Sequence, residues 1–357
     1  MIKQHILITG AGGYIGTSLV PALLLSGHRV TAVDTFWFGR ELLPQHINLV
    51  CVKQDTRNIP ADLLRGIDAV IDLAALSNDP CGETFSKATW EINHQARVRT
   101  ARVAKQAGVK RYLLASSCSV YGFSPGLLDE TSPTCPLTTY AEANLAAERD
   151  TLALNDTSFA VTALRLATLF GHSPRMRLDL VVNSMCYSAW RHGEITVNGG
   201  GTQVRPLLHV MDAAEAFHRL LEPEKANNSA GRIINIGRDD QNLAINTVAE
   251  TIARFHSHMK NRSISIRHSG PQDLRSYRVS FEEMKRILLW EPATSMGASL
   301  ENITNFLNQH QDADFVKCHT LDWYSLKGII DERAKLECLT PETQELYFYN
   351  NNKPQEV

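Results

Sequence analysis

Short apolar runs alternate with segments of helical periodicity through the first half of the chain. The runs that predict strands are His5–Thr9, Arg29–Val33, Leu49–Lys53, Ala69–Leu73, Arg111–Ala115 and Ala160–Leu166. Apolar positions recur at the spacing of a helix in the segments Ile15–Ser26, Glu91–Ala107 and Tyr140–Leu154. Strands that alternate with helices of this length form βαβ units, so the pattern predicts an α/β fold with a doubly wound parallel sheet.

The alternation becomes irregular after Gly171. Strand-like segments return at Ile195–Val197 and Arg232–Ile236, and helical segments at Asp212–Leu221 and Asn246–His256. We therefore expect residues 1–172 to form one domain, whose sheet Arg232–Ile236 completes, and residues 173–311 to form mainly a smaller second domain. Residues 312–357 are an extension without an assigned role. Its apolar residues predict an ordered helix that packs on another element, namely Trp323, Tyr324, Leu326, Ile329 and Ile330.

A glycine-rich turn joins the first predicted strand to the first predicted helix. The residues of this turn expected to contact a cofactor are Gly10, Gly13, Tyr14, Ile15 and Gly16. Glycine permits the tight turn and lets the backbone approach a pyrophosphate, which the helix N-terminus then attracts. The motif predicts a Rossmann-type domain that binds a dinucleotide, followed by a smaller C-terminal substrate domain.

Two carboxylates add to this prediction. Asp34 ends the second strand about 20 residues past the glycines, where a carboxylate accepts hydrogen bonds from the adenosine ribose and repels a 2′-phosphate. The predicted cofactor is therefore NAD(H) and not NADP(H). Asp55 follows the third strand and is either a contact to the adenine amino group or a simple strand-end carboxylate.

Composition excludes several other classes of protein. The chain has a net charge of −2, which gives no indication of a nucleic-acid or anionic-membrane partner. It has no apolar stretch near the roughly 20 residues of a membrane helix, and its first apolar run is too short for a signal peptide. Its 7 cysteines are scattered, with no C-x-x-C pair, which argues against disulfides and structural zinc. We expect a cytoplasmic protein without a metal site.

Several motifs occur in an order that is specific as a set. They are Gly10–Gly16, Leu73-Ala74-Ala75, Asn93, Ser116–Gly122, Tyr140, Leu164–Gly171 and Arg205–Val210. From about Ile6 to Pro292, the chain resembles the extended short-chain dehydrogenase/reductase family, in its nucleotide-sugar epimerase/dehydratase branch. The resemblance implies cofactor contacts from Leu73, Ala74, Ala75 and Asn93.

The resemblance also implies a catalytic set with one departure. A hydroxyl at the position of Ser117 hydrogen-bonds the substrate, and a tyrosine at the position of Tyr140 moves a proton. A lysine one turn later normally holds the nicotinamide ribose and lowers the tyrosine pKa. This chain has Asn144 there, which hydrogen-bonds but carries no charge. The chain is accordingly an active enzyme with an altered arrangement, a weakened catalyst, or an NAD-binding protein without chemistry; we favour activity.

The substrate implied by the resemblance is a nucleotide-diphosphate sugar. Its expected contacts are Ser117, Ser119, Asn183, Arg205 and Arg275, and the arginines suit phosphate because their planar fork binds two oxygens. Further expectations are a mobile loop with Arg175 and Arg177, a structural His209, a buried filler role for Cys118, and a partner for the Asp72 carboxylate that the sequence does not name.

The residues after Ser117 bear on the type of reaction. Dehydratases of this branch carry an Asp-Glu pair there, whereas this chain has Cys118 and Ser119, with Asp129 and Glu130 in a later loop. Dehydration is therefore disfavoured. The sequence favours an epimerase, with an NADH-dependent keto-sugar reductase or a non-catalytic NAD-binding regulatory protein as alternatives. The resemblance also implies a homodimer through the helices that follow Asn93 and Tyr140.

Overall fold

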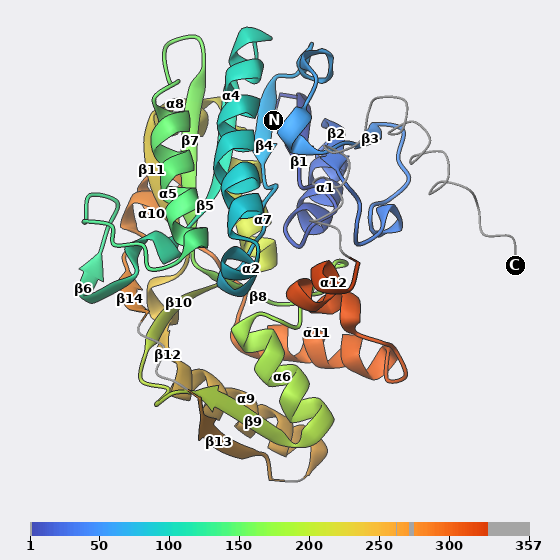
Figure 1. Ribbon diagram of the computed structural model, residues 1–357, viewed down its shortest axis with the longest axis vertical. Coiled ribbons are helices and arrows are strands. Elements are labelled where there is room, and N and C mark those ends of the chain that lie inside the picture. The colour runs from blue at the N-terminus through green and yellow to red at the C-terminus, as the bar shows by residue number, and fades with distance from the viewer. Residues whose placement is uncertain (1, 262, 271–274, 328–357) are drawn as a thin grey trace, which may run out of the picture.

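The computed structural model describes residues 2–261, 263–270 and 275–327 of the 357-residue chain. Its centre is a seven-stranded sheet in the order β11-β7-β5-β4-β1-β2-β3, and every neighbouring pair is parallel (Figure 1). The strands are β1 His5–Thr9, β2 Arg29–Asp34, β3 Leu49–Lys53, β4 Ala69–Asp72, β5 Arg111–Ser117, β7 Ala160–Leu166 and β11 Arg232–Ile236. The predicted doubly wound sheet, including the return of β11, is confirmed.

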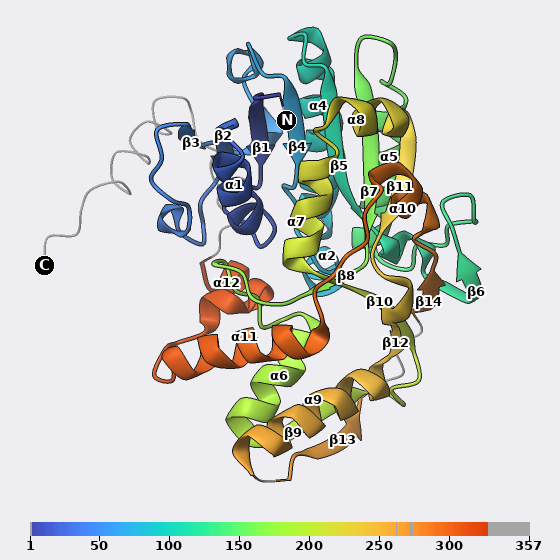
Figure 2. The same cartoon turned by 180° about the vertical axis from the view of Figure 1, so that it is seen from behind.

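Helices cover both faces of this sheet, which is why its inner strands are apolar on both sides. One face carries α4 Arg97–Gln106 and α5 Thr139–Leu152 (Figure 1). The other carries α1 Gly16–Leu25, which includes Pro21, with α7 Val210–Arg219 and α10 Glu282–Leu288, as Figure 2 shows. The short helix α8 Pro223–Ser229 precedes β11.

The helix expected over Glu91–Ala107 has a more complex geometry. It begins as α3 Ser86–Trp90, widens into a π-helix at Glu91–Ala96, and continues as α4. A π-segment changes the angular order of the side chains that follow it, and such segments occur frequently at functional sites. Here Ala96, Arg97 and Val98 are all buried.

A second core lies beyond the carboxyl ends of the strands, in the lower part of Figure 1. It is formed by α6 Val181–His192, β9 Glu194–Asn198, α9 Ile245–Lys260, β13 Ser265–Ser269 and α11 Met296–Gln309, with β9 and β13 paired in parallel. The sequence analysis predicted β9 and α9 but neither α6 nor α11. Residues 210–236 return from this half of the chain to pack on the central sheet, so the second half contributes to both cores.

Short strands and turns connect the two cores. The strands are β8 Thr168–Phe170, β10 Val204–His209 and β12 Asn242–Ala244 in one small sheet, with β6 Phe123–Leu128 and β14 Ser276–Val279 in another. Single 3₁₀ turns occur at Arg40–Leu42, Thr56–Asn58, Ala61–Leu64, Cys118–Tyr121, Asp239–Gln241 and Val316–Cys318. Helix α2 is Asp79–Thr84, and Asn78 caps it by accepting a hydrogen bond from the Cys81 amide.

The described part of the C-terminal extension forms α12 Thr320–Lys327. Trp323 and Tyr324 are buried against Trp37 and Phe38, which follow β2, and the Trp323 indole donates to the Trp37 carbonyl. An ordered, packed helix was therefore predicted correctly there, although Leu326 is 67% exposed. Ile329 and Ile330 lie outside the described residues. Within those residues, no helix is long and apolar enough to cross a membrane.

Candidate active site

A pocket of about 570 Å³ opens at the carboxyl ends of the central strands. In doubly wound sheets, ligands bind at this edge, where the strand order reverses beside β1. The volume lies within the usual range of about 300–1,000 Å³ for small-molecule sites. Residues of the glycine turn, of β2, β4 and β5, and of the second core line it together.

The glycine turn has the shape that a dinucleotide pyrophosphate needs. Gly10 has a φ of +66°, and a Cβ atom there would lie 2.7 Å from the Ala74 amide nitrogen. A Cβ atom on Gly16 would lie 2.4 Å from the Ala11 carbonyl oxygen. Helix α1 begins here without a side-chain cap or an acidic residue in its first turn, so its positive end is available to an anion.

Asp34 lies at the end of β2 and lines the pocket. Its carboxylate accepts hydrogen bonds from the amides of Gly12 at 2.9 Å and Phe36 at 2.7 Å. Burial raises the pKa of this carboxyl, and the amide hydrogen bonds oppose that rise. The carboxylate is fixed beside the glycine turn, as a ribose acceptor must be. Asp55 also lines the pocket and forms an ion pair with Arg57 at 2.6 Å.

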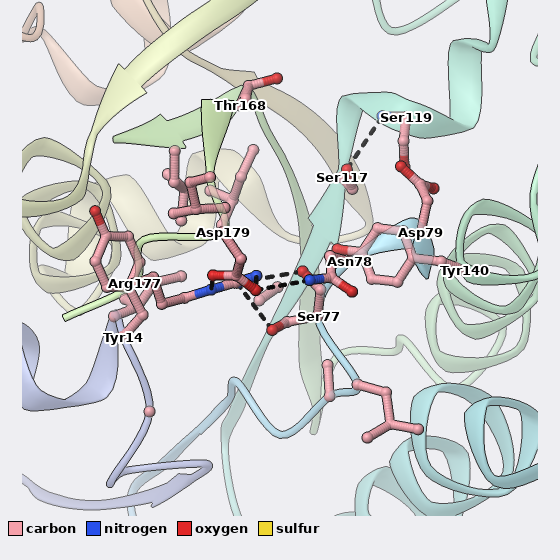
Figure 3. A pocket seen from close by; sticks show the side chains of 18 of the residues that line it. Tyr14, Ser77, Asn78, Asp79, Ser117, Ser119, Tyr140, Thr168, Arg177 and Asp179 are labelled. Atoms are coloured by element: carbon pink, nitrogen blue, oxygen red, sulfur yellow. Dashed lines mark hydrogen bonds and ion pairs between the residues drawn. The ribbon is translucent and has the colours of Figure 1, made fainter. Parts of the chain in front are cut away.

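The proposed catalytic pair lies at the centre of the pocket. Ser117 ends β5, Tyr140 lies in the first turn of α5, and both residues line the pocket. Ser117 accepts from the Ser119 amide at 3.1 Å, as Figure 3 shows. The Ser119 hydroxyl is buried and has no hydrogen-bond partner among the described residues. An unpaired buried hydroxyl that lines a pocket is available to a bound ligand.

Asn144 does not line this pocket. Its side chain is 1% exposed, donates to the Tyr140 carbonyl at 2.9 Å and accepts from the Arg97 guanidinium at 2.8 Å. Arg97 does line the pocket. The sequence analysis missed Arg97, although its helical spacing from Asn93 and Ala101 places a cation on the buried face of a helix.

Two further expected contacts are also placed behind the pocket wall. The Asn93 side chain is fully buried and forms two hydrogen bonds with the backbone of Leu76. It accepts one from the Leu76 amide and donates one to the Leu76 carbonyl, each at 2.9 Å. The Asn183 side chain accepts from the Gly171 amide at 2.9 Å and donates to the Arg177 carbonyl at 2.7 Å. Both amides shape loops of the pocket. By contrast, the backbone at Leu73, Ala74 and Ala75 lines it directly.

Arg205 and Arg275 contact each other, and both line the pocket. The Arg205 guanidinium stacks 5.4 Å from the centre of the Tyr277 ring and donates to the Arg275 carbonyl. Arg275 forms an ion pair with Asp79, which Figure 3 shows beside Tyr140. The structure thus brings the two arginines predicted to bind phosphate to one place, with an acidic residue that the sequence analysis did not identify.

Arg175 and Arg177 were expected in a mobile loop where they touch substrate or solvent, but both are buried, each 4% exposed, so the solvent interpretation was wrong. Arg177 forms an ion pair with Asp179 at 2.9 Å and donates to the Ser77 hydroxyl (Figure 3). The Arg175 guanidinium lies 3.8 Å from the centre of the Phe38 ring. Burial lowers the pKa of Arg175 to about 10, and its Nη1 atom has no partner among the described residues. This cation lines the pocket and is suited to an anionic ligand.

Other expectations from the sequence have clear outcomes. Cys118 is a buried filler, as predicted, and burial raises the pKa of its thiol. His209 is structural, as predicted, because it accepts from the Met211 amide at the start of α7. The partners of Asp72 are the hydroxyls of Thr9 and Tyr112. In the described residues, no group of three or more potential ligands could hold a metal ion.

The pocket also contains residues that the sequence analysis did not single out. They are Trp37, Phe38, Ser77, Asn78, Asp79, Thr168, Tyr277 and Tyr324. They come from segments far apart in the chain, and half of them lie outside helices and strands, so only the folded chain shows that they meet. Glu130 accepts from the Asn235 amide at 2.7 Å and is not among the lining residues.

Comparison with known proteins gives consistent matches. A model of the NAD-dependent epimerase/dehydratase family matches residues 6–237. UDP-glucuronic acid decarboxylase 1 of Danio rerio is 26% identical over 319 residues, which are 86% of this chain and 73% of that protein. UDP-glucuronate 4-epimerase of Thermodesulfobacterium geofontis is 25% identical over 324 residues, which are 86% of this chain and 97% of that protein.

Solved structures show the same similarity. MoeE5 in complex with UDP-glucuronic acid and NAD has a TM-score of 0.75 and 28% identity, over 85% of this chain and 99% of that chain. UDP-glucuronic acid 4-epimerase from Bacillus cereus has a TM-score of 0.77 and 23% identity, over 85% of this chain and 99% of that one. The second match shows a shared fold.

Proposed function

Because this chain belongs to the NAD-dependent epimerase/dehydratase family, we propose that it is an NAD-dependent nucleotide-sugar epimerase that transiently oxidises a sugar hydroxyl. The observation that carries the proposal is that Ser117 and Tyr140 line one pocket together with the glycine turn and the two arginines Arg205 and Arg275. The fitting glycine turn and Asp34 support NAD as the cofactor.

Each side chain has a defined task in this reaction. When bound, NAD supplies the site to which the carbinol hydride passes and from which it returns. Tyr140 takes the hydroxyl proton as the hydride leaves, so the sugar loses two electrons and becomes a ketone. Ser117 holds the reacting oxygen. After the sugar presents its other face and regains the hydride that the bound cofactor would supply, Tyr140 would give the proton back to the same oxygen, and that carbon would be inverted.

The diphosphate of the substrate would lie toward Arg205 and Arg275, and Ser119 would hydrogen-bond the sugar. Guanidinium groups bind phosphate oxygens in pairs, which supports this orientation. The Arg275–Asp79 ion pair would have to open or share its guanidinium when phosphate binds. Asn183 is a less direct contributor, since its amide is used by the loop around Gly171.

A second candidate function rests on the relatives named as UDP-glucuronic acid decarboxylases. Oxidation of a hydroxyl β to a carboxylate gives a β-keto acid, which loses CO₂ readily, so the same catalytic pair could serve both reactions. Two alternatives from the sequence remain. An NADH-consuming reductase is barely separated from an epimerase by the sequence, and a non-catalytic NAD-binding regulatory protein is motivated by Asn144.

NMR of a nucleotide-sugar panel with purified protein separates these functions. An epimerase inverts one sugar carbon with catalytic NAD⁺, and a decarboxylase releases CO₂ and loses the C6 signal. A reductase consumes stoichiometric NADH. NAD binding without turnover of any sugar would overturn the proposal in favour of the regulatory protein.

We also propose a homodimer through α4 and α5. Leu145 and Ala146 remain half-exposed there, although Ala96, Val98 and Ala101 are used by the core of the monomer. Light scattering coupled to size exclusion tests this assembly. No disulfide joins the cysteines within the described residues, which supports the proposed cytoplasmic location.

A further inference from the structure

Arg97 is a cation buried at the centre of the molecule. It is 2% exposed and lies in the first turn of α4, directly after the π-helix. Its guanidinium donates to the Ala74 carbonyl at 3.0 Å, the Ala115 carbonyl at 2.9 Å and the Asn144 side chain at 2.8 Å. All three acceptors are uncharged, and they belong to three different segments of the chain. They therefore fix the position of the guanidinium group without neutralising its charge.

The nearest carboxylate to Arg97 is Asp72, at 4.0 Å. Asp72 is itself committed to other donors, because it accepts from the Thr9 hydroxyl at 2.6 Å and from the Tyr112 hydroxyl. Tyr112 also donates to the Arg97 carbonyl at 3.0 Å. Asp72 thus partly balances the charge of the buried Arg97 without lining the pocket itself, whereas Arg97 does line the pocket.

We propose that Arg97 supplies the positive charge of this active site, in place of a cation at position 144, and that Asn144 serves to hold the Arg97 guanidinium beside Tyr140. This inference deepens the proposed function and rests on it. Arg97 is a positioning residue in this scheme, since it acts on the proton of Tyr140 through its charge. In this chain, which lacks a lysine at position 144 on α5, the cation that the chemistry requires is then Arg97 on α4.

The charges that face Tyr140 support this assignment. They come from Arg97 on α4, Asp79 on α2 and Arg177 on the loop before α6, and the Ser117 hydroxyl on β5 is a further polar neighbour. Burial raises the pKa of Tyr140, and among the opposing influences the charge of Arg97 is the largest. Arg177 contributes less and is paired with Asp179.

A direct test reads the phenol without turnover. Full-length protein carrying 3-fluorotyrosine at position 140, whose lower pKa brings titration into a range where proteins stay folded, is titrated by ¹⁹F NMR with and without NAD⁺. We expect Arg97→Gln to raise the pKa of this phenol by about one unit or more, the size of shift typical of losing a neighbouring opposite charge. The matched control is Arg102→Gln, an exposed arginine on the same helix, which should leave the pKa unchanged.

Two further variants keep the test decisive. Arg97→Gln leaves the buried Asp72 carboxylate without its neighbouring positive charge and could fail to fold for that reason. The double variant Arg97→Gln with Asp72→Asn removes both charges and is then titrated in its place. The exchange variant Arg97→Gln with Asn144→Lys should return the phenol pKa toward that of the native protein. It should also return the acid limb of the pH profile of kcat, which moves to higher pH in Arg97→Gln.

The outcomes separate this inference from the function itself. A folded Arg97→Gln protein whose phenol titrates as in the native protein would show that Arg97 is only structural and would overturn the proposal. A raised phenol pKa that the exchange variant reverses supports it, even if no nucleotide sugar in the panel is turned over. In that last case the proposed function fails and the assignment of the charge stands.

Discussion

Tyr140 is the side chain on which the proposed chemistry depends most directly. Removing its hydroxyl in Tyr140→Phe leaves the packing of α5 intact but removes the group that takes the proton. We expect kcat to fall by about 10²–10⁴-fold, the usual contribution of a general base. NAD affinity, followed by fluorescence titration, should change little. A variant that keeps more than a tenth of the native kcat would assign the proton transfer to another group.

Asp34 decides which dinucleotide the pocket accepts. In Asp34→Ala, the ribose hydroxyls lose a charged acceptor, and we expect NAD affinity to fall by about 10–100-fold, equivalent to about 1.5–3 kcal/mol. The variant also lacks the carboxylate that repels the 2′-phosphate of NADP, so the ratio of the affinities for NAD and NADP should decrease. Calorimetry with both dinucleotides measures this. Asp62→Ala, which changes an exposed aspartate, is the control and should bind like the native protein.

The cofactor motif could be predicted because its residues are adjacent in the chain, and the positions of Gly10 and Asp34 within it follow from local geometry. The setting of Asn144 could not be predicted, because the partner that defines it lies 47 positions away. A cation on the buried face of a predicted helix was the available signal. This signal identifies Arg97 as unusual, but it does not identify Asn144 as the residue that Arg97 contacts.

At the scale of elements, periodicity predicted the strands of the central sheet to within two residues at each end, since parallel strands buried on both faces are nearly continuous apolar runs. It missed α6, whose apolar positions are interrupted by Asn183, Ser184 and Ser188. Asn183 and Ser188 are polar because their side chains hydrogen-bond the backbone of neighbouring segments, at the Gly171 amide and at the carbonyl of Glu194 in β9. Pattern alone does not separate such residues from exposed ones.

Helix α12 should stabilise the loop after β2. Trp323→Ala removes a side chain that is buried against Trp37 and Phe38, and we expect a loss of about 3–5 kcal/mol in the free energy of unfolding. NAD should also bind more weakly, because Tyr324 and Phe38 line the pocket. Urea unfolding and NAD titration measure both effects. Leu326→Ala, on the exposed face of α12, should differ from the native protein by less than about 0.5 kcal/mol. Equal effects in the two variants would contradict this packing.

At the scale of the whole molecule, Asp179 joins three distant segments. Its carboxylate accepts from Arg177, from the Asn78 side chain at 2.8 Å and from the Thr320 amide at 3.4 Å. Burial alone would raise the pKa of Asp179, but the Arg177 charge prevails and holds it well below the usual value. The segment before α6, the start of α2 and the start of α12 therefore depend on one ionised group.

This arrangement predicts how stability depends on pH. Because the pKa of Asp179 is lower in the folded chain than about 3.9 in the unfolded chain, its contribution is complete near neutral pH and is lost as pH falls through the acid range. Asp179→Asn should cost about 3 kcal/mol at pH 7, and the gap from the native protein should shrink below about pH 4. Urea unfolding at several pH values measures the gap. A gap independent of pH would refute the role of the charge, and exposed Asp240→Asn is the control.

The position of α12 has a consequence for how the protein is synthesised. All seven strands of the central sheet have left the ribosome once residue 236 has emerged, whereas Tyr324, which closes part of the pocket, comes almost 90 residues later. The central sheet is thus translated well before α12, which carries the last residue that lines the pocket. A premature stop codon after α11 should yield a chain with a formed sheet and an incomplete pocket, so cofactor loading in the cell belongs to the end of translation.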